Sequence, residues 1–230
     1  MEPPSVRHAQ SGDVNDTARL ETFADGVMAI AITLLILEVG VPHVEGRSLG
    51  SAIARQWPSY VAFVVSFLTI GIIWVNHHHM FRLIARTNHT FLILNVLFLM
   101  TICILPWPTA LLADYARDSE GATVAAAIYG GVMTAVSIMF NLVWRYAAKD
   151  QRLLVPGISP EAIARSHRNY LAGPVVYGAA VVMAFIEPKV SIGIYAALAV
   201  YWLLPRIGPR AELAQDPLTR PGNERLATGS

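Results

Sequence analysis

The stretch RLETFADGVMAIAITLLILEVGVP, residues 19–42, decides the fold. It sets three ionisable residues, Arg19, Glu21 and Asp25, at the start of a run of aliphatic and small residues that reaches Glu38. A helix needs about 20 mainly apolar residues to cross the hydrocarbon core of a bilayer. The stretch therefore predicts a membrane-spanning helix, and it raises the question of why charges accompany it.

The composition of the whole chain agrees with a membrane protein. Of its 230 residues, 54% are hydrophobic and 14% are charged, and the mean hydropathy is +0.47, whereas soluble proteins carry roughly 25% charged residues. The net charge of +1 provides no field that would attract nucleic acid. Cys103, the one cysteine, lies in an apolar run, which excludes a disulfide framework and a cysteine metal site. No cofactor is expected.

Six segments are long and apolar enough to span a bilayer, so we predict an all-α integral membrane protein with six transmembrane helices. The expected spans are residues 19–41, 54–80, 88–113, 121–147, 168–187 and 190–205. The chain then divides into a polar N-terminal segment, 1–18, a membrane domain, 19–205, and a disordered cytoplasmic tail, 206–230. The polar start shows no cleavable signal peptide, so the first span would direct its own insertion.

Proline positions and polar stretches predict where a span breaks and where loops join the spans. Pro106 and Pro108 should kink or end the third span. The polar stretch 149–167 reads as a surface linker, and a tight hairpin at 187–189 should join the last two spans.

Basic residues set the orientation, because cytoplasmic loops are enriched in Lys and Arg. With the N-terminus inside, 13 of the 17 Lys and Arg residues fall on the cytoplasmic side. Both termini are therefore predicted to be cytoplasmic, in a multi-pass protein of the plasma membrane.

One continuous stripe runs along the first span. Val27, Ile30, Leu34, Leu37 and Val41 recur at steps of three and four, with Thr33 beside them. Such a stripe is the ordinary packing face of a bundle helix. With polar residues at both ends and an apolar middle, it equally fits the wall of a pore with a hydrophobic constriction.

Charges at this depth need partners, because they are costly in a membrane and normally face the bundle interior or a watery cavity. Arg19 and Asp25 lie about 240° apart around the helix and cannot pair with each other. The second span offers candidates in Trp74, Asn76 and His77–His79. Consecutive helical residues point about 100° apart, so the three histidines cannot share one metal ion, and no metal site is predicted. We expect one or two of them to face inward and hydrogen-bond to Asp25, Asn95 or a neighbouring chain, while the third reaches the membrane interface.

These residues resemble a known family. The pattern R-x-x-x-F-A-D at Arg19, Phe23 and Asp25, followed by GVMAIAITLLILE, is similar to the signature helix of the transmembrane protein 175 family, the lysosomal and bacterial potassium channels. The likeness continues through SFLTIGIIWVNHHHMF and LNVLFLMTICILPWPTALL and covers about the first half of the chain. The family usually has serine where this chain has Ala24, which removes one hydroxyl.

The resemblance implies a homotetramer in which four copies of the first helix line a pore for potassium ions. Carried over by position, Ile30 would be the narrowest ring, Thr33 and Leu34 the next layer, and Leu37 the ring nearest the outside. An anchoring network of Arg19, Phe23, Asp25, Trp74 and His77 would hold the pore helix. The opening motif has no second copy in the chain, which agrees with a pore made by several subunits.

A weakly potassium-selective channel is thus the predicted function. The chain has no TVGYG filter, so an aliphatic ring would select by forcing partial dehydration, which is easier for potassium than for sodium. Glu38 would concentrate cations at the outer mouth or lie at the surface as an ordinary carboxylate. The rivals are a secondary transporter, a cation or proton leak pathway, and an intramembrane enzyme. The lack of an inverted repeat stands against a transporter. No nucleophile or metal triad accompanies the histidines and Asp25, so an enzyme is not expected.

Overall fold

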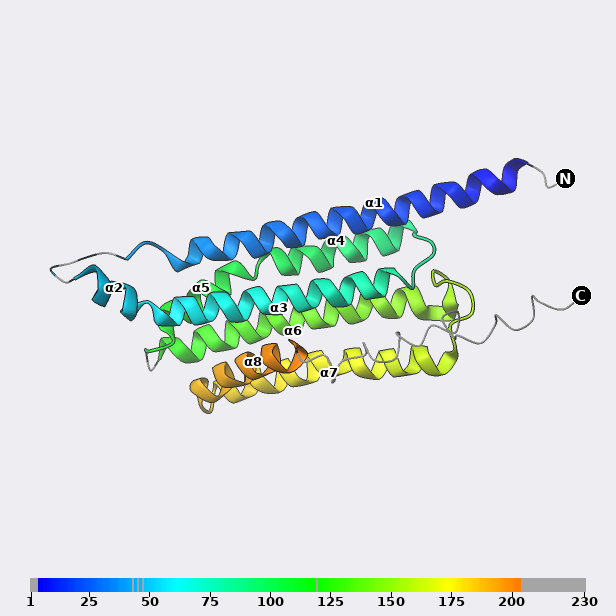
Figure 1. Cartoon of the computed structure of the whole chain (residues 1–230). Helices are drawn as coiled ribbons and strands as arrows, with labels where there is room; N and C mark the ends of the chain where they lie inside the picture. The colour runs from blue at the N-terminus through cyan, green and yellow to red at the C-terminus, as the bar shows by residue number, and fades with distance from the viewer. Residues whose placement is uncertain (1–3, 43, 45, 47, 119, 204–230) are drawn as a thin grey trace, which may run out of the picture.

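The computed structural model describes residues 4–42, 44, 46, 48–118 and 120–203, with side chains from Thr17 onward. These residues form an elongated bundle of helices that run along one axis (Figure 1). The elements are α1 Pro4–Leu34, η1 Leu35–Val39, α2 Leu49–Arg55, α3 Trp57–Phe81, α4 His89–Cys103, α5 Pro106–Tyr115, α6 Gly121–Ala148, η2 Lys149–Gln151, α7 Pro160–Ala184 and α8 Pro188–Leu203. The predicted tail, 206–230, lies outside the described residues.

Four stretches of the described chain are long and apolar enough to cross a membrane: Thr17–Val39, Trp57–Phe81, His89–Tyr115 and Gly121–Gln151. They coincide with the first four predicted spans. The helices α7 and α8 occupy the fifth and sixth predicted places but do not meet the same test of length and composition. The described part of α8 has 16 residues, and the first half of α7 carries Arg165, His167 and Arg168.

The prediction for the two prolines is confirmed. Helix α4 ends at Cys103 and α5 begins at Pro106, with Pro108 in its first turn. Neither proline has an N–H to donate to the preceding turn, so the hydrogen-bond ladder breaks there and the helix restarts.

The expected linker 149–167 is too long. Helix α7 already begins at Pro160, where the Ser159 hydroxyl accepts a hydrogen bond from the Ala162 N–H at 3.2 Å. A serine cap followed by proline starts a helix whatever the polarity of the next turns. The linker prediction was therefore wrong from Pro160 onward.

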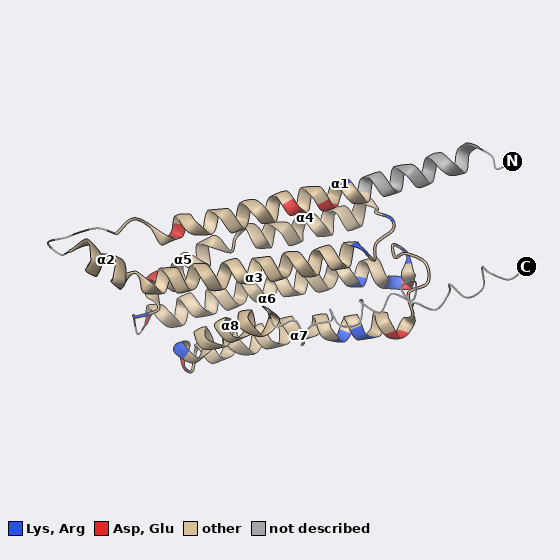
Figure 2. Cartoon of the chain, viewed as in Figure 1, with Lys and Arg blue, Asp and Glu red and all other residues tan. Residues whose placement is uncertain are grey.

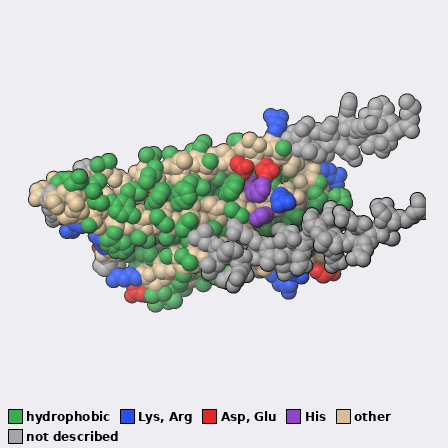
Figure 3. Space-filling model, viewed as in Figure 1, with side chains coloured by type: hydrophobic (Ala, Val, Ile, Leu, Met, Phe, Trp, Pro, Cys, Tyr) green, Lys and Arg blue, Asp and Glu red, His purple; other side chains and the backbone are tan. Residues whose placement is uncertain are grey.

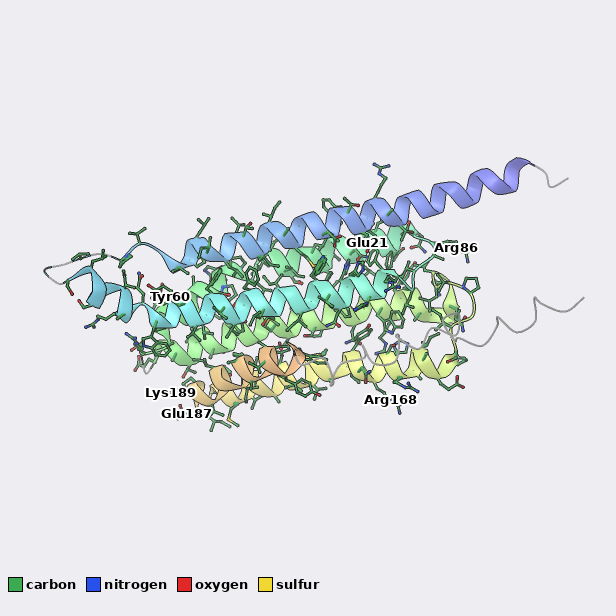
Figure 4. All side chains as sticks on the ribbon, in the orientation of Figure 1. Glu21, Tyr60, Arg86, Arg168, Glu187 and Lys189 are labelled. Atoms are coloured by element: carbon green, nitrogen blue, oxygen red, sulfur yellow. The ribbon has the colours of Figure 1, made fainter. Side chains whose placement is uncertain are left out.

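Two connections meet at one end of the bundle. The α3–α4 connection pairs with the segment after η2 through Ala85 N–H to Leu153 C=O, 2.8 Å, and Val155 N–H to Leu83 C=O, 2.9 Å. We call this the basic end, because Lys and Arg gather there (Figure 2). Its described basic residues are Arg82, Arg86, Arg145, Lys149, Arg152, Arg165 and Arg168. Figure 4 places Arg86 and Arg168 toward this end and the Glu187–Lys189 turn at the other.

Large apolar side chains fill the centre of the bundle. Trp144, Tyr129, Phe91, Phe98 and Met28 are among the largest fully buried side chains. They come from α1, α4 and α6, so the core is shared by helices distant in sequence. Hydrophobic side chains also cover much of the face seen in Figure 3, as expected where the surrounding solvent is lipid.

Candidate pore helix and its contacts

Helix α1 has a buried face that packs on the rest of the chain. Leu20, Ala24, Met28, Ala31 and Leu35 are buried and recur at steps of three and four. The α1 residues pack on α3 and α4, and η1, which begins at Leu35, packs on α3 and α5. The small side chains of Ala24 and Ala31 let the helix backbones approach closely, as is usual between membrane helices.

The opposite face of α1 is left uncovered by this chain. Ile30 is 61% exposed and Leu37 is 69% exposed. Thr33 and Leu34 are exposed with them, and the Thr33 hydroxyl donates back to the Ile30 carbonyl at 2.9 Å. All four residues predicted to line a pore thus lie on one outward face. Val27 of the predicted stripe is partly buried and packs against the core instead.

A second set of contacts fixes the rotation of α1 against α3. The indole Nε1–H of Trp74 donates to Asp25 Oδ1 at 2.8 Å. One helical turn nearer the basic end, His78 Nδ1 lies 2.9 Å from Glu21 Oε1. The rings of Trp74 and His78 stack with centroids 6.0 Å apart. Figure 3 shows acidic, histidine and basic side chains gathered at one place on a mostly apolar face.

The Glu21–His78 contact was not anticipated from the sequence. A signal for it exists, because Glu21 and Asp25 are four residues apart on α1, and Trp74 and His78 are four apart on α3. Residues at that spacing lie on one helix face, so two acids facing two donors make a two-rung ladder between antiparallel helices.

His77 points in another direction from its neighbours. It is fully buried, and its Nε2 lies 3.3 Å from Asn95 Oδ1 on α4. The Asn95 Nδ2 group donates to the Phe91 carbonyl at 2.8 Å, so the amide oxygen faces His77 and accepts from Nε2–H. The ring also stacks on Phe98. His77 therefore ties α3 to α4, and its described hydrogen-bond partner is Asn95 and not Asp25.

The remaining two residues of the predicted anchoring network stand apart within the single chain. Phe23 is 54% exposed on the uncovered side of α1. Arg19 is exposed, and it forms no hydrogen bond or ion pair with the residues that the structure describes. An anchoring role for these two residues stays a prediction that requires a second chain.

Removing the Trp74 donor should weaken the attachment of α1. Trp74→Phe leaves the Asp25 carboxylate without its indole partner, which we expect to cost about 1–2 kcal/mol and to lower the melting temperature of the detergent-solubilised protein. Trp107→Phe is the matched control, because Trp107 is 56% exposed on α5. Equal melting temperatures for the two variants would contradict an anchoring contact.

The histidine run should not hold a metal ion. No group of three or more His, Cys, Asp or Glu side chains among the described residues is placed to ligate one. We expect elemental analysis of protein purified without an affinity tag to find no stoichiometric zinc, copper or nickel. One bound metal per chain would refute this expectation.

Comparison with known proteins identifies the family. The family model for the endosomal/lysosomal potassium channel TMEM175 matches residues 19–106, from α1 to the start of α5. A potassium channel of Streptomyces collinus is 41% identical over 190 residues, which cover 82% of this chain and 92% of that protein. The chain belongs to the TMEM175 family.

Other TMEM175 proteins extend the likeness beyond residues 19–106. A potassium channel of Chamaesiphon minutus is 42% identical over 198 residues, 85% of this chain and 97% of its own. A crystal structure described as a lysosomal potassium-selective channel TMEM175 homolog from that organism superposes with a TM-score of 0.74, covering 82% of this chain and 96% of that chain. TMEM175 of Gallus gallus, named a proton channel, is 32% identical over 143 residues, 28% of its length. The resemblance inferred from the first helix is thus confirmed.

Proposed function

We propose that this chain is a potassium channel whose pore is lined by the outward face of α1 in a homotetramer of the plasma membrane. The observation that carries the proposal is the two-faced α1. One face is held by the core and by the Trp74–Asp25 contact. The other leaves Ile30, Leu34 and Leu37 exposed on the outside of the described chain.

Assembly of several subunits would place the apolar face of α1 around a common pore. A single described chain leaves the face on its outside, so a pore along it requires further copies around a common axis, as in closed cyclic assemblies. The relatives from Streptomyces collinus and Chamaesiphon minutus carry potassium channel in their names, which supports the same activity here. Six membrane helices in each subunit complete the proposal, with α7 and α8 as the last two.

Selectivity would arise from dehydration. Four copies of Ile30 form a ring that carries no charge and no polar side-chain atom, so an ion that passes it gains no protein ligand for the water it gives up. Potassium releases water at a lower cost than sodium. A weak preference for potassium follows, with Thr33 and Leu34 as the next layer and Leu37 toward the outside.

The deciding measurement is current through the purified protein in a planar bilayer. A potassium channel passes current that reverses near the potassium equilibrium potential and needs no coupled substrate. Saturable uptake coupled to a second solute would instead identify a secondary transporter. Counting subunits by stepwise photobleaching of a labelled chain tests the tetramer, and a maximum of two bleaching steps would exclude it.

Proton conduction is the second candidate, because vertebrate TMEM175 relatives are named proton channels. The same bilayer distinguishes it. With potassium and sodium replaced by an impermeant cation and a pH difference imposed, a current that reverses at the proton equilibrium potential would assign proton permeability to this chain.

A further inference from the structure

Three buried hydroxyl groups connect α3, α5 and α6. Ser66 Oγ lies 2.8 Å from Thr109 Oγ1 and 3.3 Å from the hydroxyl oxygen of Tyr129. The Thr109 hydroxyl donates to the Leu105 carbonyl at 2.8 Å, so it accepts from Ser66, and Ser66 in turn accepts from Tyr129. All four residues are at most 2% exposed. We call this row of hydrogen bonds the hydroxyl chain.

The hydroxyl chain holds a helix that has lost its regular connection to the preceding one. Helix α4 ends at Cys103 and α5 begins at Pro106, and neither Pro106 nor Pro108 has an N–H to bond back to α4. The regular ladder therefore does not fix the direction of α5, which depends on its contacts with α3 and α6. A buried hydroxyl without a partner is unfavourable, so the hydroxyl chain favours one placement of α5 on these two helices.

Helix α5 packs on η1, the 3-10 turn that follows the proposed pore-lining helix. Leu37 belongs to this turn, whereas Ile30 belongs to the regular α-helix before it. A 3-10 turn that interrupts a helix often marks a hinge. Leu35, the buried residue of η1, lies in the same core cluster as Leu105. The position of η1 therefore depends on α5 as well as on α3.

We infer that the hydroxyl chain positions the outer ring of the proposed pore: Ser66 and Thr109 hold α5, α5 supports η1, and η1 sets the direction of Leu37. The inference rests on the proposed function, because that function assigns Leu37 to a pore. Both hydroxyl residues are positioning residues, since they are buried behind η1 and act through α5. Ile30 is held separately, by the polar contacts between α1 and α3. Loss of the hydroxyl chain therefore displaces Leu37 and leaves Ile30 in place.

The experiment measures distances within one subunit by double electron–electron resonance, which needs no ion current. The full chain carries Cys103→Ala and two spin-labelled cysteines. One labelled pair is Leu37→Cys with Ile93→Cys, on the exposed face of α4, and the other is Ile30→Cys with Ile93→Cys. An excess of unlabelled, cysteine-free chains in the liposomes keeps each measured distance inside a single subunit. Thr109→Val should shift and broaden the first distance distribution and leave the second as in the parent.

Three further variants separate the hydroxyl groups from general packing. Thr109→Ser keeps the hydroxyl and should retain both parental distributions. Ser66→Ala removes the middle member of the hydroxyl chain and should act as Thr109→Val does, so it supplies the same test if Thr109→Val gives no folded peak in size-exclusion chromatography. Thr134→Val is the matched control, because the Thr134 hydroxyl donates to the Gly130 carbonyl of its own helix at 2.7 Å. It should leave both distributions unchanged.

A bilayer recording connects the position of Leu37 to conduction. In Thr109→Val the unitary current should differ from that of the parent, while the potassium-to-sodium permeability ratio assigned to Ile30 stays at the parental value. A parent without potassium current would contradict the proposed function, and the distances would still decide the positioning role. Parental Leu37 distances in Thr109→Val and Ser66→Ala overturn the inference. Equal broadening at Leu37 and Ile30 also overturns it, because the hydroxyl groups would then only stabilise the bundle.

Discussion

Replacing Ile30 with asparagine is expected to lower the potassium-to-sodium permeability ratio by up to about tenfold while current persists. The substitution keeps a similar volume but places an amide in the proposed ring. That amide can replace water that either ion gives up, which reduces the difference in dehydration cost between them. A polar contact of this kind is worth about 1 kcal/mol or more, and 1.4 kcal/mol corresponds to tenfold.

The competing role of Ile30 gives a different result. If its exposed face met lipid or another helix without lining a pore, the new amide would be unpartnered in hydrocarbon at a cost of a few kcal/mol. Assembly would then fail, and any channels that remained would keep the parent ratio. Reversal potentials in mixed potassium and sodium gradients separate the two cases.

Ile36→Asn is the control for an amide placed beside the proposed pore face. Ile36 is 52% exposed and lies in η1, the 3-10 turn that follows α1, where successive residues point about 120° apart, so it points away from Leu37. We expect this variant to keep the parent permeability ratio. If Ile36→Asn lowered the permeability ratio as much as Ile30→Asn, the assignment of Ile30 as the selective ring would be contradicted.

Gly130→Ala should be the most damaging small substitution in the second half of the chain. A methyl group at Gly130 would overlap the Tyr195 hydroxyl of α8 and lie 2.7 Å from Val181 Cγ2 of α7. Three helices meet at this glycine, and Tyr195 also donates to the Ala126 carbonyl at 3.0 Å. Overpacking of this kind costs about 1–3 kcal/mol, which corresponds to several degrees of melting temperature.

The neighbouring glycine supplies the control. Gly131 has no atom within 4 Å of the position its methyl group would take, so Gly131→Ala should leave the melting temperature unchanged or raise it. Tyr195→Phe removes the hydroxyl that the new methyl group meets, and it should partly restore Gly130→Ala. Equal melting temperatures for the two alanine variants, measured by fluorescence-detected chromatography after heating, would contradict the close approach of α8.

Part of the polar network could be anticipated from the sequence, and part could not. The spacing of the histidines was enough to exclude a shared metal ion, because helical direction depends only on residue number. The assignment of Asp25 to Trp74, and of His77 to Asn95, required the structure. The spacing of residues in the sequence predicts the direction of a side chain around its own helix. It does not predict how far one helix is shifted along another.

The sequence by itself determined the first four of its six predicted spans, where the third span breaks and which face of α1 is aliphatic. Each of these properties is local: hydrocarbon demands a continuous apolar helix, and proline lacks an N–H wherever it occurs. Only the tertiary structure decided that Ile30 lies on the uncovered face, that Glu21 meets His78, and that α6, α7 and α8 approach closely at Gly130. These outcomes depend on the relative rotation, register and length of packed helices, which arise when all of them bury their faces together.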